Sequence, residues 1–170
     1  RGYQPGAGLA AGKDPSKVVV PKSLPDTSLV RSDILDYYTE VEHFDQMVER
    51  ALNLLEQRGE LDNTIVVVTS DHGMPFPRAK ASLYDTGTRV PLAIRWKKGI
   101  QNPGRVSNDF VNLSDLAPTY LAIAGLTQPS EMTGHSLLNI LKDDQSNPQR
   151  DRDHALIAME RHDGCRKGGK

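Results

Sequence analysis

The sequence predicts an α/β protein in which helices cover a mostly parallel sheet, and three observations lead to this fold class. A nearly continuous β-branched run over 64–69 has the length of a strand and the composition of one buried on both faces. A long helical pattern over 28–58 leads into this strand through a short loop, which makes half of a βαβ unit. A further apolar run over 90–96 predicts the next strand.

The first 28 residues predict irregular connecting structure. They are rich in Gly, Pro and Lys, and their one β-branched run, 18–20, is closed by Pro21, so it forms at most a short strand. The segment 6–13 combines glycines with a lysine, as phosphate-binding loops do. Its glycine spacing is wrong, however, and Asp14 stands where such a loop needs Ser or Thr, so we interpret the segment as a plain loop.

The helix predicted over 28–58 is amphipathic and ends at Gly59. Its apolar residues recur at three- and four-residue steps: Ile34, Tyr38, Val41, Val48, Leu52 and Leu55. Asp45 falls close to this stripe, and an unpaired carboxylate there is costly, so we expect it to have a hydrogen-bond or cationic partner in a structural role. His43 falls on the opposite, charged side and is interpreted as a surface histidine.

The second half of the chain continues the alternation of helix and strand. The pattern predicts a helix over 114–124, a helix over 136–141, a polar surface loop over 143–153 and a strand over 155–159. Ser114 is the expected N-cap of the first of these helices and Gly125 its stop signal.

Charge and composition exclude several classes of protein. The 21 Lys and Arg residues against 22 Asp and Glu leave a net charge of −1, without the positive excess of a dedicated nucleic-acid binder. No apolar run approaches the ~20 residues that a membrane span requires. We therefore expect neither nucleic acid nor membrane as a partner. The single cysteine, Cys165, excludes an internal disulfide and a cysteine-rich zinc site.

The strongest local signal follows the β-branched strand at its carboxyl end, where α/β proteins gather their ligands. Asp71 offers an anionic oxygen, His72 an imidazole nitrogen, and Gly73 lets the backbone turn away, so the pair is a candidate for holding a metal ion. An Asx-turn carboxylate beside a hydrogen-bonded histidine explains the same three residues equally well. Two ligands cannot close a calcium shell, and the chain has no obvious acidic cluster to supply the others.

A loop over 74–82, stiffened by two prolines, carries two cations past this turn. Arg78 suits bidentate binding of an oxyanion, and Lys80 suits a point contact to one sulfate or phosphate oxygen. The alternative is that both are solvated cations on a mobile loop.

Several of these segments together resemble the sulfatase family of the alkaline-phosphatase superfamily. The resemblance extends from about residue 25 to 138 and is carried by 62–73, Lys80, 83–84, 87–92 and 113–119. The loop over 74–77 is most similar to the heparan N-sulfatase (sulfamidase) branch and its bacterial relatives. The resemblance implies an alkaline-phosphatase-like mixed, mostly parallel sheet flanked by helices.

The resemblance also implies roles for particular residues. Asp71 matches the calcium-ligating aspartate of the family, and His72 occupies the next ligand position. Lys80 matches the catalytic cation that contacts the sulfate group, a position that sulfamidases can fill with Arg. His162 lies where sulfamidase-like enzymes place substrate-facing polar residues, and a surface histidine is the alternative there.

The implied activity is hydrolysis of sulfate esters or N-sulfo groups on a sulfated sugar or glycosaminoglycan-type substrate. It needs a calcium ion and a formylglycine, and the family implies a periplasmic or secreted location. Cys165 is not in the family's Cys/Ser-x-Pro/Ala-x-Arg motif, because Arg166, Lys167 and Gly168 follow it, and the paired-aspartate metal motif is also absent. We therefore expect 1–170 to be a middle-to-C-terminal part of a sulfatase catalytic domain, inactive alone.

Two other functions stay open from the sequence. Phosphodiesterases and phosphonate monoester hydrolases of the same superfamily also carry Asp-His-Gly after a strand. A non-catalytic binding module derived from the sulfatase fold would explain the missing nucleophile. His43, His135 and His154 match no family site and are interpreted as structural.

Overall fold

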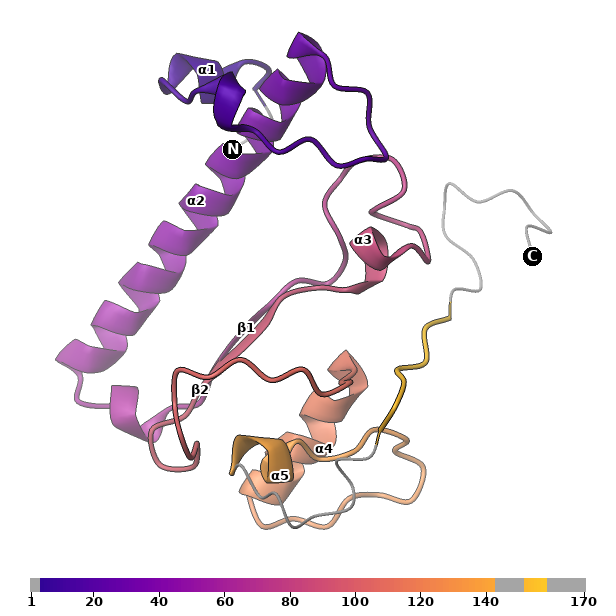
Figure 1. The fold of residues 1–170 in the computed structure, drawn as a ribbon. Coiled ribbons are helices and arrows are strands. Elements are labelled where there is room, and N and C mark those ends of the chain that lie inside the picture. Colours follow the sequence, from indigo (N-terminus) through magenta and orange to yellow (C-terminus); the bar gives the residue numbers. More distant parts are fainter. Residues whose placement is uncertain (1–3, 143–151, 159–170) are drawn as a thin grey trace.

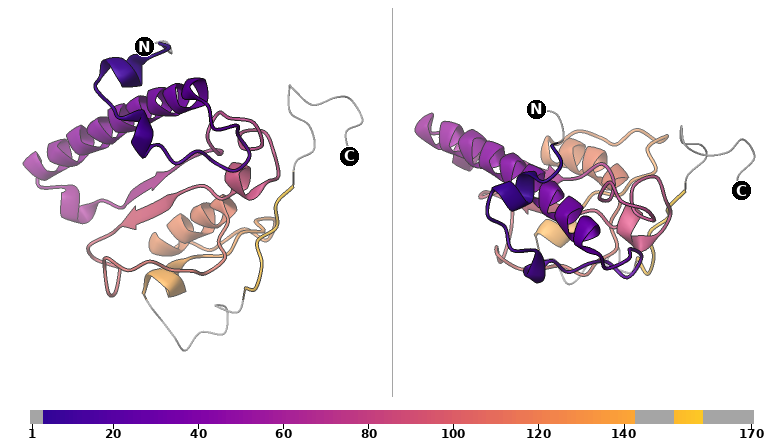
Figure 2. Two further views of the ribbon diagram at one scale, coloured as in Figure 1. Left: turned by 45° about the horizontal axis from the view of Figure 1, so that its top comes forward. Right: turned by 90° about the horizontal axis from the view of Figure 1, so that it is seen from above.

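The computed structural model describes residues 4–142 and 152–158 (Figure 1). Its helices and strands are, in chain order, α1 (Ala7–Ala10), α2 (Ser28–Gln57), β1 (Val66–Thr69), α3 (Asp85–Thr88), β2 (Leu92–Arg95), α4 (Leu116–Ile123) and α5 (Leu138–Leu141). Short 3₁₀ turns precede α2, β1 and α4: Pro15–Lys17, Leu61–Asn63 and Leu113–Asp115. In Figures 1 and 2, α2 and α4 lie on opposite sides of the strand pair, an arrangement that agrees with the predicted α/β class.

The strands β1 and β2 form a two-stranded antiparallel sheet, in which Val66 lies opposite Arg95 and Thr69 opposite Leu92. The sequence predicts a mostly parallel sheet, so the direction of this pair differs from that expectation. The physical reason is the connection over 70–91, whose one helix, α3, is only four residues long. A parallel crossover usually carries a helix that packs on the sheet, and this connection has no such helix and returns the chain antiparallel. All four residues of β1 are half-buried, not fully buried as predicted.

The long helix α2 confirms the predicted helix over 28–58. The Thr27 hydroxyl accepts a hydrogen bond from the backbone N–H of Val30 (3.3 Å) and caps the helix, and Gly59 follows it with a φ of 71°, in the left-handed region that favours glycine. Only the first turns are well covered, because Ile34 and Leu35 pack with Val18 in the core.

The far half of α2 corrects one expectation. Asp45 is exposed, and within the described part of the chain its carboxylate has neither the hydrogen-bond partner nor the cationic partner that the sequence predicts. The buried carboxylate of the helix is Asp36, which accepts hydrogen bonds from the backbone N–H groups of Gly6 and Gly8, both at 2.8 Å. Asp36 therefore fastens α1 to α2, a contact between distant segments that helical periodicity cannot predict.

The later elements follow the prediction except at the end. The helix predicted over 114–124 is confirmed as a 3₁₀ turn that continues into α4, and the one over 136–141 is confirmed as α5. The segment 155–158 is extended but forms no strand, since no described segment hydrogen-bonds to it, and Leu156 is 81% exposed there. Met159 and most of the predicted loop, 143–151, lie outside the described residues.

None of the helices in 4–142 and 152–158 combines the length and the apolar character that crossing a bilayer requires.

Candidate functional site

The turn that leaves β1 is held by side chains at both of its ends. The Thr69 hydroxyl donates to the carbonyl of Pro91 (2.7 Å), which ties the end of β1 to the start of β2. The Ser70 hydroxyl donates to the carbonyl of His72 (2.7 Å) across the turn itself. Local hydrogen bonds therefore set the conformation of the segment that carries the candidate metal ligands.

Gly73 joins this turn to the segment over 84–88. Its backbone N–H donates to the carbonyl of Gly87 (3.0 Å). A Cβ atom at Gly73 would lie 1.9 Å from the carbonyl oxygen of Thr86, far inside van der Waals contact. Only glycine fits this close approach of two backbones, as the sequence indicates.

We expect Gly73→Ala to lower the free energy of unfolding by about 2 kcal/mol or more, because the two backbones must separate to admit the methyl group. Gly104→Ala is the matched control, since Gly104 has a φ of 84° and no neighbour within 4 Å of an added Cβ. The control carries left-handed backbone strain alone, which costs about 1 kcal/mol. Urea denaturation measures both, and equal losses would contradict the close packing at Gly73.

The side chains of Asp71 and His72 face each other across the turn. His72 Nδ1 lies 2.7 Å from the carbonyl oxygen of Gly73, and because a carbonyl only accepts, Nδ1 carries the hydrogen. His72 Nε2 lies 3.4 Å from Asp71 Oδ2. The side chain of Asp71 is 84% exposed and that of His72 is 36% exposed, so both are open to solvent and to a ligand.

This arrangement is suited to hold part of a cation shell. With Nδ1 donating to the Gly73 carbonyl, Nε2 is the ring nitrogen left to face Asp71 and a ligand. Two ligand atoms that each lie about 2.4 Å from one ion, with a right angle between them at the ion, are about 3.4 Å apart. Asp71 Oδ2 and His72 Nε2 are separated by the same distance, 3.4 Å. The residues described here include no group of three or more His, Cys, Asp or Glu that could hold a metal. The spacing of Asp71 and His72 is compatible with two ligands of one ion, and a calcium shell needs further oxygens that the described residues do not bring to this turn.

The loop over 74–80 is docked on the core through Phe76. The ring of Phe76 packs edge-on against Tyr37 of α2, with ring centroids 5.9 Å apart, and it also contacts the core cluster around Val18. Ala79 is only 2% exposed and its carbonyl accepts from the Ser82 hydroxyl (2.8 Å). The loop is therefore anchored on the core at Phe76 and Ala79, while Arg78 and Lys80 are exposed to solvent.

Lys80 is attached to the Asp71 turn through the backbone. Its N–H donates to the carbonyl of Met74 (3.0 Å), one residue after Gly73. The side chain is exposed, and no carboxylate among residues 4–142 and 152–158 pairs with it. An unpaired ammonium on a docked loop can contact an oxyanion without first breaking an ion pair.

The structure thus brings three of the four predicted site residues to one region. Asp71 and His72 share the turn after β1, and Lys80 lies on the loop that follows it. The fourth, His162, lies outside the described residues. Two hollows of the described part of the chain lie elsewhere: one of about 540 Å³ beside the start of α2, lined by Arg31 among others, and one of about 110 Å³ near the end of α2.

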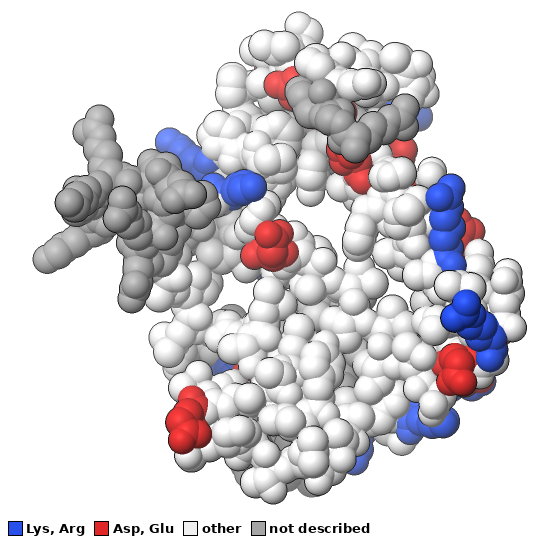
Figure 3. Space-filling model, turned by 180° about the vertical axis from the view of Figure 1, so that it is seen from behind, with Lys and Arg blue, Asp and Glu red and all other residues white. Residues whose placement is uncertain are grey.

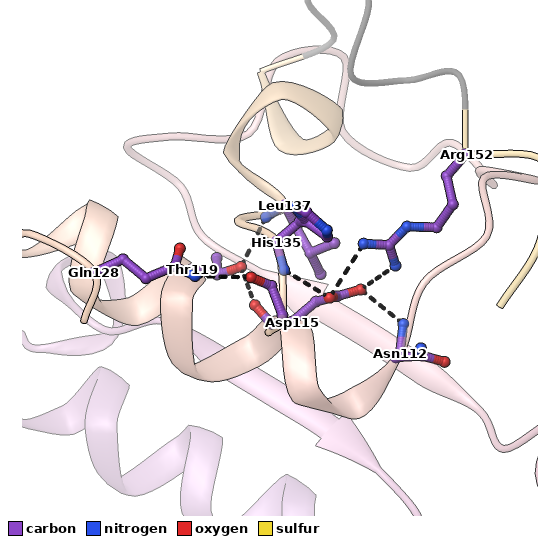
Figure 4. A network of polar contacts seen from close by, with 8 residues as sticks. Asn112, Asp115, Thr119, Gln128, His135, Leu137 and Arg152 are labelled. Carbon is purple, nitrogen blue, oxygen red and sulfur yellow. Dashed lines mark hydrogen bonds and ion pairs between the residues drawn. The ribbon is translucent and has the colours of Figure 1, made fainter. Parts of the chain in front are cut away.

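The sequence missed a second polar centre, at Asp115 (Figure 4). This carboxylate is 1% exposed and accepts from the backbone N–H groups of Asn112 (2.8 Å) and His135 (2.9 Å). Arg152 donates to both of its oxygens, at 2.7 and 3.4 Å. Asp115, and not Ser114, therefore organises the start of α4, and the Asn112-x-x-Asp115 spacing, typical of a capping box, is the signal that could have indicated it.

The pKa of Asp115 reports this environment. Burial raises the pKa of the carboxyl, but the Arg152 hydrogen bonds and the two backbone N–H groups outweigh burial and leave the pKa below its ordinary value. Asp115 is therefore a charged structural anchor that joins α4, the 134–137 segment and residue 152 (Figure 4).

On the rest of the surface, positively and negatively charged side chains are mixed. Seen from behind (Figure 3), Lys and Arg lie in several separate places with Asp and Glu between them. Arg31 is bound by Asp26 (2.6 and 2.8 Å), and Asp62 contacts both Arg95 and Lys97. This view does not show one continuous basic surface.

Fold and site together define the class of the protein. A strand pair between helices places it among the α/β proteins, a class in which ligands commonly gather at strand ends such as the one that carries Asp71 and His72. The family model described as Sulfatase matches residues 8–126, which is more than half of the chain. The chain belongs to the sulfatase family.

Curated relatives agree with this family. N-sulphoglucosamine sulphohydrolase from Homo sapiens is 38% identical over 138 residues, which are 76% of this chain and 28% of that protein. N-acetylglucosamine-6-O-sulfatase from Bacteroides thetaiotaomicron is 39% identical over 117 residues, 66% of this chain and 21% of that protein. The chain therefore spans about a quarter of the length of these relatives.

Two solved structures are similar in fold and are alkaline-phosphatase-like. The structure of BT4656 in complex with its substrate D-glucosamine-2-N,6-O-disulfate is 34% identical, with a TM-score of 0.55, over 68% of this chain and 22% of that one. A phosphonate monoester hydrolase from Silicibacter pomeroyi is 26% identical, with a TM-score of 0.61, over 81% of this chain and 28% of that one. These likenesses confirm the expected fold class.

Proposed function

We propose that the chain works as part of a longer sulfatase, which hydrolyses sulfate ester or N-sulfo bonds of a sulfated sugar. The observation that carries this proposal is the site after β1, where a carboxylate–imidazole pair and an unpaired lysine occur together on one turn and its following loop. The sulfated-sugar enzymes among its relatives support the substrate class. The attacking group, a formylglycine in this family, would come from outside these 170 residues, as would the general acid.

The residues of this chain would bind and orient the sulfuryl group. Lys80 would contact a sulfonyl oxygen and stabilise the negative charge that develops there in the transition state. Asp71 and His72 would supply two ligands to a calcium ion, and the bound ion would add positive charge beside the same oxygens. His162, by the same resemblance, would contact the sugar.

We expect Asp71→Asn in the longer protein to weaken calcium binding at least tenfold, because the neutral amide is a poorer ligand than a carboxylate. Asp45→Asn is the matched control, since Asp45 is an exposed carboxylate on α2. Titration calorimetry with calcium measures both affinities. An unchanged affinity in Asp71→Asn would mean that the carboxylate is only a turn cap.

The activity is tested by measuring sulfate release from N-sulfoglucosamine and from glucosamine 6-O-sulfate with the longer protein. We expect release from at least one of them, and hydrolysis of a phosphonate monoester at least 100-fold slower in kcat/KM. The second candidate, a phosphonate monoester hydrolase, is favoured by the likeness to the Silicibacter pomeroyi structure. Faster hydrolysis of the phosphonate ester would replace the first proposal with the second, and saccharide binding without hydrolysis of either would indicate a binding module.

A further inference from the structure

The loop over 74–88 holds a second cation, Arg78, in an unusual setting. Its guanidinium carbon lies 5.9 Å from the centroid of the Tyr84 ring, a cation–π distance. Arg31, Arg95 and Arg152 each pair with an aspartate, whereas within the described ranges no carboxylate pairs with Arg78. Its N–H donors are therefore available to a ligand.

The backbone around Arg78 is held in an uncommon conformation. Arg78 and Ala81 have φ values of 61° and 58°, both in the left-handed region that favours glycine. The Thr86 hydroxyl donates to the carbonyl of Arg78 (2.6 Å), and the buried Ala79 anchors the chain one residue later. Strain of this kind persists where the surrounding contacts enforce it, and it clusters at ligand-binding sites.

Arg78 and Lys80 flank the buried Ala79, so their Cα atoms are at most about 7 Å apart. The cation–π contact with Tyr84 favours one placement of the arginine side chain before a ligand arrives, which lowers the entropy cost of binding. The planar guanidinium can then donate two parallel hydrogen bonds, a bidentate contact that matches the oxygens of a sulfate or a carboxylate.

We propose that Arg78, positioned by Tyr84, binds a second anionic group of the saccharide whose first sulfate contacts Lys80. The protein would thus select sugars with two anionic groups over sugars with one. This inference rests on the proposed function, since it defines the substrate class of the same site.

The test compares D-glucosamine-2-N,6-O-disulfate with glucosamine 6-O-sulfate, using the longer protein and its Arg78→Gln variant. KM is measured if the wild type hydrolyses them, and Kd by titration calorimetry if it does not. We expect the wild type to favour the disulfate about tenfold or more, as a bidentate charged contact allows. Arg78→Gln should remove this preference by raising KM for the disulfate alone, with kcat within about twofold of wild type.

Three further variants separate positioning from charge. Arg78→Lys keeps the charge but loses the planar donor, so it should recover only part of the preference. Tyr84→Leu removes the ring and should raise the disulfate KM several-fold while Tyr84→Phe, which keeps the ring, should not. Arg58→Gln, an exposed arginine after the end of α2, is the control that should change nothing.

The outcomes distinguish this inference from the proposed function. Hydrolysis with the same substrate preference in Arg78→Gln as in wild type overturns the inference and leaves the function intact. A binding preference that Arg78→Gln removes, in a protein that hydrolyses neither of these sugars nor N-sulfoglucosamine, supports the inference and overturns the function. A comparison of KM or Kd for N-sulfoglucosamine with and without a linked glucuronic acid shows whether a carboxylate can be the second anionic group.

Discussion

Replacing Lys80 with Ala in the longer protein is expected to lower kcat by about 100- to 1000-fold, the loss typical of removing one group that stabilises transition-state charge. The loop itself should stay in place, because Phe76 and Ala79 dock it and the Lys80 side chain takes no part in the core. Sulfate release measures kcat, and circular dichroism with thermal denaturation shows whether the fold is unchanged.

Two variants give this experiment its controls. Lys80→Arg keeps the positive charge, and since sulfamidases can carry Arg at the matching position, it should retain activity within about tenfold of wild type. Lys142→Ala removes an exposed lysine after α5, on another part of the molecule, and should leave kcat unchanged (Figure 1). Near-normal kcat in Lys80→Ala would refute the role assigned to this residue.

The second large effect is expected on stability, from Asp115→Ala. The substitution leaves the backbone N–H groups of Asn112 and His135 without their acceptor and Arg152 without its partner. Breaking a buried, hydrogen-bonded ion pair costs about 3–5 kcal/mol, so we expect a loss of that size in the free energy of unfolding. Glu131→Ala, at an exposed carboxylate, is the matched control and should lie within about 0.5 kcal/mol of wild type.

The pH dependence of stability checks the charge of Asp115. Its folded-state pKa is lowered by the Arg152 and backbone hydrogen bonds, which outweigh burial. The stability that this lowered pKa provides is therefore fully present above the ordinary aspartate value of about 3.9 and is lost as the pH falls through the folded-state pKa. Urea denaturation should show a wild-type advantage over Asp115→Ala that is constant from pH 7 to about 4.5 and narrows below about 4. If the stability advantage of wild type over Asp115→Ala stayed constant at low pH, Asp115 would not be a charged anchor.

Local pattern predicted the longer elements of this protein, but it missed the four-residue helices α1, which lies in a predicted plain loop, and α3. The three- and four-residue spacing predicted α2, β-branched runs predicted β1 and β2, and glycine at position 59 marked a helix end. The Asp71–His72 pair was also predicted from the sequence as a candidate site, because a polar turn at the end of a strand is a signal contained in neighbouring residues. These features depend on contacts between residues that are close in the chain.

Other features depend on contacts that no local pattern contains. The partners of Asp36 lie 28 and 30 residues away, and those of Asp115 reach to Arg152, 37 residues further on. The absence of a strand at 155–158 has the same origin, since a strand exists only where another segment pairs with it.

The sequence by itself thus determined the α/β class, the positions of the main helices and strands, and the residues that carry the candidate chemistry. Only the tertiary structure decided that β1 and β2 run antiparallel, that Asp36 and Asp115 are the buried anchors, and that Arg78 lies at cation–π distance from Tyr84, near a lysine, Lys80, that no described carboxylate pairs with. The reason is physical: backbone periodicity is written in adjacent residues, whereas burial, pairing and charge compensation are set by whichever distant segments the folded chain brings together.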